Sequence, residues 1–487
     1  MKNIIYTALA LSAIFVASCK KDTLQPVQKE LIPGDIHEII DTLSGPVTVN
    51  TTLTRTTFLS GLVYVKPGIT LTINPGVTIK CSSYGDRYLF DYNLSDVSYM
   101  KGTLLIEKGA KLISNGTPAA PIVWTSDKPA VFRRPGDWGG IVILGNAPIT
   151  SSFGEVSNSY IGLGQFRVQP DARYGGPDST DNSGSITYNR IEYGGGILLF
   201  DMEFGDSEGI TSLNLCGVGS NTTIHHVEVA NSFSDGFHFL GGTVNTHHLI
   251  SFNSRDEDFS FDEGFNGKLQ FIVGYKFDFR EGVDGTSMIE VQNNDRGQQY
   301  AGRTKTNPFI VNATLIGGER DFGRPPVKFK SCVYVKDRGL IRLVNSIVIP
   351  YGVPSLLTST PSSYPSFFLP KTATDASVVF RNLFAPASPN IIFKDVDDRD
   401  TKEGHDYTLA PDNALKEQFV VNENTFVAWA PNLKLGAKLE PLSGSPALKG
   451  GINLAAYGFV GTSQRGAVTS NDVWTNKSWI SFERSPF

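Results

Sequence analysis

The chain has 487 residues and a formal net charge of −5, which becomes −6 when residues 1–18, with their one lysine and no acid, are removed. A net negative chain is poorly suited to bind nucleic acid or an anionic lipid surface. The 49 glycines and 27 prolines, among stretches rich in Thr, Ser, Val and Ile, favour strands broken by tight turns over helices. We therefore expect an all-β protein with no nucleic-acid partner.

The N-terminus has the pattern of a bacterial export signal. An apolar run from Ile4 to Ala17 follows Lys2 and is too short to span a bilayer, so residues 1–18 are expected to be a signal peptide. Cys19 follows Val-Ala-Ser and resembles the lipobox cysteine of bacterial lipoproteins, which implies lipidation at Cys19. The polar residues 19–45 are then the lipidated N-terminus and a solvated tether. This pattern predicts a lipid-anchored protein of the bacterial outer membrane.

The first regular segments alternate between apolar and polar residues with a period of two. From Leu62 to Lys80 the apolar positions are separated by the turns Pro67-Gly68 and Pro75-Gly76, and residues 102–113 repeat this pattern. Turns at such short intervals are typical of the corners of a coil built from short strands. Three cysteines follow Cys19 far apart in sequence, and we expect them to be buried, unreactive thiols: Cys81, Cys216 and Cys332.

A repeat of about 22 residues lies between Thr223 and Val273. Phe237 and Phe239 recur as Phe259 and Phe261, and the same offset relates three further segments: His225–Val227, His247–Leu249 and Leu269–Phe271. A short period that keeps apolar positions in step indicates a solenoid, because one coil cannot bury its apolar face without a stacked neighbour. We expect stacked phenylalanines inside a parallel β-helix, and Asn231 over Asn253 at a turn that needs a left-handed backbone.

The rest of the chain completes the expected domain organisation. Strand-like segments continue at wider spacing after residue 310, and a loop rich in Pro, Ser and Thr separates them from a C-terminal region. A short helix is expected around residues 413–418. We expect the following domains: the β-helix at 46–350, the Pro/Ser-rich loop at 351–375, and a C-terminal continuation and cap at 376–487.

Several motifs resemble a known family. The segments 217–228, 235–245 and 256–267, with Gly444-Ser445-Pro446-Ala447, Arg465-Gly466-Ala467, Trp474 and Trp479 near the end, look like right-handed parallel β-helix lipoproteins and cell-surface proteins of Bacteroidetes. These belong to the pectate-lyase-like superfold. The resemblance implies a right-handed parallel β-helix and an outward-facing surface protein. It implies no particular activity, because the superfold carries lyases, glycosidases, esterases, adhesins and inert spacers.

An acidic cluster is the main candidate site. If Phe259 and Phe261 point inward, alternation places three side chains outward: Asp258, Ser260 and Asp262. Carboxylates gathered on one patch suit calcium, so we expect metal ligands at Asp256, Asp258 and Asp262 and further binding residues at Asp235, His238, Glu257 and Glu263. Candidate catalytic residues, which would stabilise charge or remove a proton, are Arg255, Lys268, Lys276 and Arg280. The alternative interpretation is a solvated acidic edge that these same basic residues neutralise.

The histidines offer a second candidate site. His226 is expected to stack over His248 with Glu228 nearby, a set that could hold zinc. Alternation, however, places His225 and His226 on opposite faces, which favours polar stacking over metal binding.

Three functions are compatible with these observations. The first is a glycan-binding or scaffold lipoprotein on the cell surface, with a polysaccharide or an outer-membrane protein complex as partner. The second is a calcium-dependent polysaccharide lyase or glycoside hydrolase, in which calcium bridges a uronate carboxylate and a basic residue removes a proton. The third is an adhesin or structural spacer.

Overall fold

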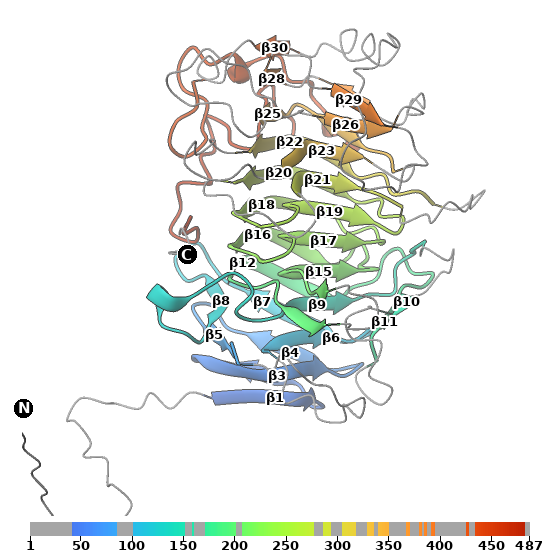
Figure 1. The fold of residues 1–487 in the computed structure, drawn as a ribbon, viewed down its shortest axis with the longest axis vertical. Helices are drawn as coiled ribbons and strands as arrows, with labels where there is room; N and C mark the ends of the chain where they lie inside the picture. Colours follow the sequence, from blue (N-terminus) through green and yellow to red (C-terminus); the bar gives the residue numbers. More distant parts are fainter. Residues whose placement is uncertain are drawn as a thin grey trace, which may run out of the picture. The chain divides into compact units, whose positions relative to one another are not determined.

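Parallel strands stacked in register form one large sheet, as Figure 1 shows. Residues Ile40–Phe487 form one unit, and the predicted signal peptide and predicted lipidation site Cys19 lie outside the described residues. No helix long and apolar enough to cross a membrane occurs in the described part. The residues that this computed structural model describes are 41–84, 101–150, 158–159, 171–200, 207–276, 286–293, 304–317, 329–335, 339–349, 367–370, 379–381, 384–386, 391–394, 425–427 and 434–482.

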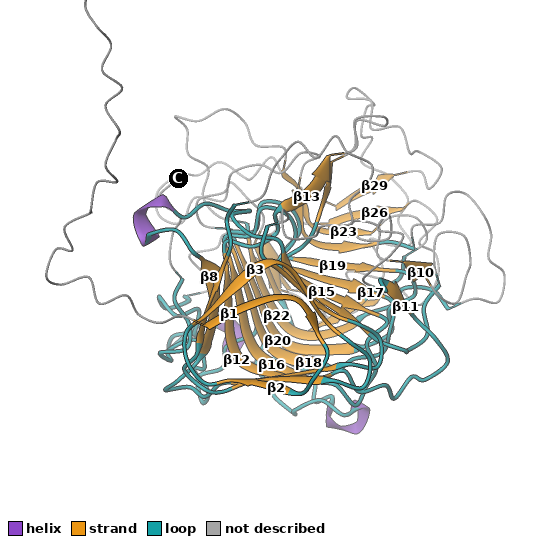
Figure 2. Ribbon diagram, turned by 90° about the horizontal axis from the view of Figure 1, so that it is seen from below, coloured by secondary structure: helices purple, strands orange, loops and turns teal. Residues whose placement is uncertain are grey.

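The strands form three faces of a right-handed parallel β-helix around one apolar interior (Figure 2), which confirms the predicted fold class. Face A contains β6 (Thr103–Ile106), β9 (Gly140–Leu144), β15 (Leu213–Cys216), β17 (Phe237–Leu240), β19 (Phe259–Asp262), β21 (Thr286–Val291), β23 (Phe329–Val335), β26 (Phe367–Pro370) and β29 (Ile391–Lys394). Face B contains β2 (Thr51–Leu53), β4 (Thr70–Ile73), β7 (Lys111–Asn115), β24 (Arg342–Val344) and β27 (Val379–Arg381). Face C contains β5 (Thr78–Cys81), β8 (Ile122–Ser126), β25 (Ile347–Ile349), β28 (Phe384–Pro386) and β30 (Thr425–Val427).

Longer strands bend from one face into the next. Five of them run from face B into face C: β12 (Gly184–Glu192), β16 (Thr223–Ala230), β18 (Thr246–Phe252), β20 (Lys268–Tyr275) and β22 (Phe309–Ile316). β1 (Asp41–Val47), which begins before the expected start at residue 46, and β3 (Thr57–Val65) join faces C and A. The remaining elements among the described residues are two antiparallel strand pairs and three 3-10 turns: β10 (Asn158–Ser159) with β11 (Arg173–Tyr174), β13 (Ile197–Phe200) with β14 (Ser207–Gly209), Ala130–Phe132, Pro446–Leu448 and Ala455–Tyr457.

The predicted stacking of like residues is confirmed on face A. Phe237 pairs with Phe259 and Phe239 with Phe261, with ring centroids 5.2 and 5.0 Å apart. All four rings are fully buried, so the stack fills the interior with rigid apolar surface. The three cysteines that follow Cys19 are also free and buried, as predicted.

The third copy of the repeat is shifted by one residue. His247 pairs with Gln270 and Leu249 with Ile272, an offset of 23, so the expected constant offset of 22 is wrong beyond β18. The additional residue lies in the turn between β19 and β20. An insertion there keeps the apolar side chains of β20 facing inward, because a one-residue slip within the strand would reverse them.

Left-handed residues turn the strands at the corners. Between faces B and C, six described rungs from β12 onward each have one residue with a φ between 53° and 58°: Tyr188, His226, His248, Phe271, Asn312 and Asn345. A single left-handed residue interrupts the alternation of a strand and bends it into the next face. Between faces C and A, Asn231 and Asn253 have φ values of 57° and 56°, which confirms the predicted left-handed turn.

We expect the corner at Asn253 to depend on its backbone conformation. Replacing Asn253 with alanine should lower the free energy of unfolding by about 1–2 kcal/mol, because an ordinary residue is disfavoured in the left-handed region. Replacing Asn253 with glycine should cost much less, since glycine adopts this conformation readily. Chemical denaturation of both variants tests this expectation. Equal losses would mean that the side chain, and not the backbone, stabilises the corner.

The C-terminal residues 434–482, here called the strap, lie along the outer side of the B–C corner. Ala447 packs with Ile347 and Ile349, whereas the Ser478 hydroxyl donates a hydrogen bond to the carbonyl of Pro118 in an early rung. The strap therefore runs back along the stack. Its backbone bonds with outward side chains of successive rungs, including Asn345, Gln270 and Glu228.

Candidate functional site

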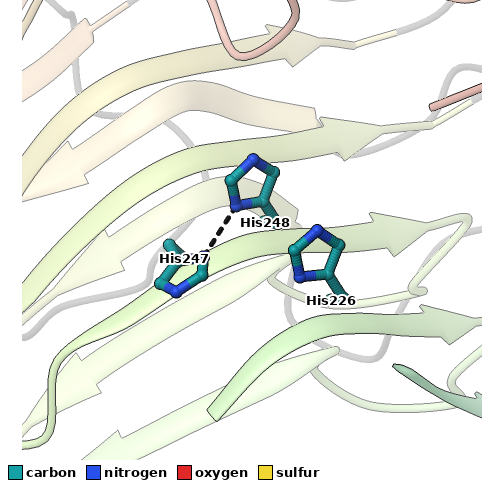
Figure 3. A group of neighbouring side chains, drawn as sticks. All are labelled: His226, His247 and His248. Atoms are coloured by element: carbon teal, nitrogen blue, oxygen red, sulfur yellow. Dashed lines mark hydrogen bonds between the residues drawn. The ribbon is translucent and has the colours of Figure 1, made fainter. Parts of the chain in front are cut away.

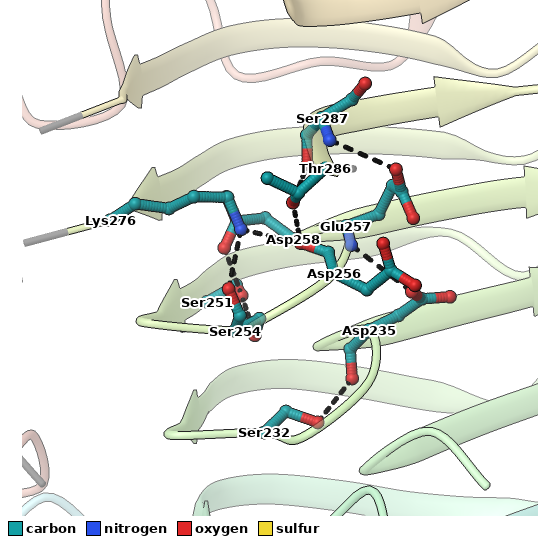
Figure 4. Close-up of polar contacts among 10 residues, drawn as sticks. All are labelled: Ser232, Asp235, Ser251, Ser254, Asp256, Glu257, Asp258, Lys276, Thr286 and Ser287. Carbon is teal, nitrogen blue, oxygen red and sulfur yellow. Dashed lines mark hydrogen bonds and ion pairs between the residues drawn. The ribbon is translucent and has the colours of Figure 1, made fainter. Parts of the chain in front are cut away.

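Three carboxylates meet where the chain enters face A (Figure 4). Asp235 precedes β17, and Asp256 and Glu257 precede β19 one rung further along the stack. One oxygen from each of the three lies within 4.8 Å of the others. The amide of Glu257 donates to Asp235, and the amide of Ser287 donates to Glu257, so the backbone fixes two of the three carboxylates. We call Asp235, Asp256 and Glu257 the acidic cluster.

Burial makes the acidic cluster electrostatically unfavourable without a cation or a shared proton. Asp235 and Glu257 are both buried. Desolvation, followed by the nearby charges of Glu257 and Glu290, raises the pKa of Asp235 well above its ordinary value. Oxygen ligands held this close suit a hard divalent cation such as calcium. The structure thus brings together Asp256, a predicted metal ligand, with Asp235 and Glu257, two predicted binding residues.

His238 lies next to the acidic cluster. It pairs with Ser260 across the rung, as predicted, and its Nδ1 atom is 3.8 Å from an Asp235 oxygen. Burial lowers the pKa of His238 to about 4, so the ring is neutral at neutral pH. Ser260 in turn pairs with Glu290, which sequence reasoning missed. Strict alternation through β21 could have identified Glu290, because Ile289 and Val291 on either side of it belong to the interior.

Asp258 points into the β-helix and not outward. One of its oxygens accepts a hydrogen bond of 2.6 Å from Ser251, and the other lies 3.4 Å from the Lys276 ammonium group. Ser251 faces the interior, because it pairs with the core residue Val229. The predicted outward orientation of Asp258 is therefore wrong: Asp258 occupies the turn before β19, where strand alternation does not apply.

Lys276 neutralises Asp258 and is itself fully buried. Its ammonium group also donates to the carbonyls of Ser254 and Asp256, 2.7 Å away in each case. Burial nevertheless raises the pKa of Asp258 to about 6, against the opposing influence of Lys276 and Ser251. Through Ser251, Asp258 and Lys276, this buried pair connects three segments of the β-helix: β18, the turn before β19 and the end of β20.

The other two predicted acids lie at the far end of β19. Asp262 accepts a hydrogen bond from the amide of Glu263, and Glu263 accepts one of 2.7 Å from the Tyr174 hydroxyl. Burial, followed by the charge of Glu263, raises the pKa of Tyr174 well above its ordinary value. Asp262 and Glu263 are thus separated from the acidic cluster by the length of the strand.

The predicted catalytic residues that the structure describes do not form one group. The Arg255 guanidinium lies 5.1 Å from the centre of the Phe233 ring. Lys268 donates to the carbonyl of Tyr457 in the strap, and Lys276 is held inside the helix by Asp258. Arg280 lies outside the described residues.

Four histidines form a second polar group on the outer side of the B–C corner, part of which Figure 3 shows. His225 stacks on His247 and His226 on His248, which confirms the predicted stacking. His225 and His226 do not lie on opposite faces, because the left-handed backbone of His226 turns its ring outward beside His225. The carboxylate of Glu228 binds the strap and not the histidines, since it accepts hydrogen bonds from the amides of Ser481 and Phe482.

The strap partly covers these histidines. The rings of Trp474 and Trp479 approach His248 and His226, with centroid distances of 4.9 and 5.6 Å. Partial burial is the main cause that lowers the pKa of three of the histidines: His226 to about 3, His247 to about 4 and His248 to about 2. The rings are therefore neutral at neutral pH.

Comparison with known proteins identifies the domain. The family model described as "Pectate-lyase like beta helix domain" matches residues 45–337, more than half of the chain. No curated protein matches the chain. One similar solved structure is the "Crystal structure of Dettilon tailspike protein (gp208)", with 11% identity and a TM-score of 0.17 over 71% of this chain and 64% of the tailspike chain. The chain belongs to the family of pectate-lyase-like β-helix domains.

Proposed function

We propose that this protein is a lipoprotein of the bacterial outer membrane that faces the cell exterior and binds glycans, alone or as an accessory or scaffold protein in a larger complex. The lipobox-like residues before Cys19 support the anchor, and the resemblance to Bacteroidetes surface lipoproteins supports the location. Membership of the pectate-lyase-like domain family is compatible with a glycan ligand.

The acidic cluster is the observation that carries this proposal. Its three carboxylates come together on the β-helix, and calcium held there would present open coordination positions to a carboxylate or hydroxyl of a sugar. Asp235 and Glu257 would be oriented by the backbone amides that bond to them. Such a site explains why acidic side chains are buried beside one another.

A calcium-dependent polysaccharide lyase is the second candidate, favoured by the family to which the domain belongs. A lyase also needs a base that reaches the substrate carbon next to the uronate carboxylate. Lys268 and Lys276 are each bonded to another part of the protein, which favours binding over catalysis among the described candidates.

Calcium should bind to the acidic cluster and stabilise the protein. For the soluble chain that starts after residue 22, saturating calcium should raise the melting temperature, because a ligand of the folded state alone stabilises it. Glu257→Gln should weaken calcium binding at least tenfold in calorimetry, whereas Asp171→Asn, which removes a more exposed carboxylate elsewhere, should not. No heat from calcium would contradict the metal site.

Glycan binding is tested on the same variants. We expect acidic polysaccharides such as polygalacturonate to retard the protein in affinity electrophoresis with calcium, and to do so less after calcium removal or in Glu257→Gln. Release of unsaturated sugars would instead establish the lyase. Neither retardation nor product, over a panel of acidic and neutral polysaccharides, would contradict both functions.

A further inference from the structure

The four histidines of the B–C corner form two pairs, and within each pair the Nδ1 atoms of the two rings face each other. The Nδ1 atoms of His225 and His226 are 2.9 Å apart, and those of His247 and His248 are 2.7 Å apart. The two pairs occupy adjacent rungs, and their rings stack with centroid distances of 4.8 and 4.4 Å. His226, His247 and His248 each place one ring nitrogen within 4.8 Å of the others.

We propose that His226, His247 and His248, with His225 as a fourth imidazole, bind a late divalent transition metal such as Cu²⁺ or Ni²⁺. Imidazole nitrogen is a preferred ligand of these ions. The site is separate from the acidic cluster, because it lies outside the B–C corner under the strap, whereas the cluster lies at the entry to face A.

The spacing of the nitrogens favours these ions over zinc. Two neighbouring ligands about 2.0 Å from a square-planar or octahedral metal are about 2.8 Å apart, which agrees with the observed pairs. Neighbouring nitrogens around tetrahedral zinc are farther apart, about 3.3 Å for bonds of about 2.0–2.1 Å. The nitrogens of the two rungs lie within 4.8 Å of one another, so binding of one metal to both rungs would require the stacked rings to tilt toward each other.

Metal binding requires a change of tautomer and no net loss of a proton. Without metal, the short contact within each pair is an N–H···N hydrogen bond, so one Nδ1 carries the proton and the other accepts it. Binding through both Nδ1 atoms moves that proton to the Nε2 atom of the same ring. Metal binds the neutral form of imidazole, and these rings are already neutral, so no imidazolium has to lose a proton first.

The strap supplies an orienting carboxylate. Asp472 lies 3.8 Å from the Nε2 atom of His248, the ring nitrogen that does not face His247. A carboxylate that faces the remote nitrogen of a ligating histidine fixes its tautomer and raises its basicity. His247 is exposed, so a metal ion can enter from solvent. Asp472 is a positioning residue in this arrangement.

Tryptophan fluorescence provides the test. Trp474 and Trp479 lie against His248 and His226, so bound Cu²⁺ should quench their emission. We would titrate CuCl₂ and NiCl₂ into the untagged chain that starts after residue 22, which retains the whole unit Ile40–Phe487. Calorimetry gives the affinity, and electron paramagnetic resonance of the Cu²⁺ form reports imidazole nitrogens directly.

The variants separate this site from other metal binding. His247→Ala should weaken Ni²⁺ binding at least tenfold, and Asp472→Asn should weaken it roughly tenfold through the orientation of His248. Asp171→Asn, which removes an exposed carboxylate outside the B–C corner, should leave the affinity unchanged. Circular dichroism confirms folding of each variant, and His247→Gln provides a second, less disruptive change. Binding that is equal in the wild type and His247→Ala, or no quenching and no heat, would overturn the proposal.

Discussion

Replacing Lys276 with methionine should lower the free energy of unfolding by about 3–5 kcal/mol, because it leaves the Asp258 carboxylate buried without its partner. The change also removes the donor of two hydrogen bonds to the carbonyls of Ser254 and Asp256. Both partners of this pair are fully buried, so water cannot replace the lost interaction. Chemical denaturation monitored by circular dichroism measures the loss.

The double variant Asp258→Asn/Lys276→Met separates the ion pair from the packing. It should be more stable than Lys276→Met alone, since the unpaired charge has been removed and a buried pair often contributes little net stability over a neutral replacement. The exposed pair Arg55–Asp41 provides the control, and Arg55→Met should change stability little. A double variant that is less stable than both single variants would contradict the argument.

The pH dependence of stability gives an independent readout of Asp258. Its pKa is about 6 in the folded protein and near its ordinary value of 3.8 in the unfolded chain. Between pH 6 and pH 4 the folded state therefore binds a proton that the unfolded state does not, and this group makes the folded state more stable as the pH falls. Asp258→Asn should remove that contribution. An unchanged pH profile in Asp258→Asn would mean that the carboxyl titrates normally.

The interior of the protein could be predicted from sequence because it repeats. Phe237 and Phe259 occupy equivalent positions in a short period, and stacking is the arrangement in which each coil buries its apolar side chains. The left-handed turn at Asn231 and Asn253 was predictable for a similar reason, since asparagine tolerates the required φ. Both inferences depend only on local spacing and residue type.

The candidate sites were predicted less well because they depend on corners and on distant contacts. Asp258 lies one residue before β19, outside the range in which alternation assigns a face, so its sequence position alone could not show that it meets Lys276 inside the helix. His226 has a left-handed backbone, a conformation that Asn or Gly in a sequence indicates but His does not. The sequence predicted the residues of the acidic cluster but not their grouping, because the contact of Asp235 with Glu257 depends on how two turns on neighbouring rungs align.

The strap shows the same limit on a larger scale. Trp474 and Trp479 were associated with the end of the chain, but apart from stacking on each other their rings contact residues more than two hundred positions earlier, Tyr188 and His226 among them. Nothing in the local sequence specifies which face a C-terminal segment covers. The matching surface consists of the outward side chains of the B–C corner, and that surface exists only once the rungs are stacked.

We expect Trp479 to hold the strap onto the β-helix. Its ring is fully buried, stacks on Trp474 and meets the edges of Tyr188 and His226. Trp479→Ala should therefore lower the free energy of strap opening by about 3–5 kcal/mol, the range for truncating a buried aromatic residue. The rungs should remain folded, because their interior does not include Trp479.

Limited proteolysis measures this opening. When opening is fast compared with cleavage, the cleavage rate follows the population of the open form, so cutting within residues 434–482 should accelerate at least a hundredfold. Tyr457→Ala provides the matched control, because it removes an aromatic ring of the same strap that is 60% exposed. Cleavage at the wild-type rate in Trp479→Ala would show that the hydrogen bonds of Glu228, Gln270 and Asn345 hold the strap without the tryptophan.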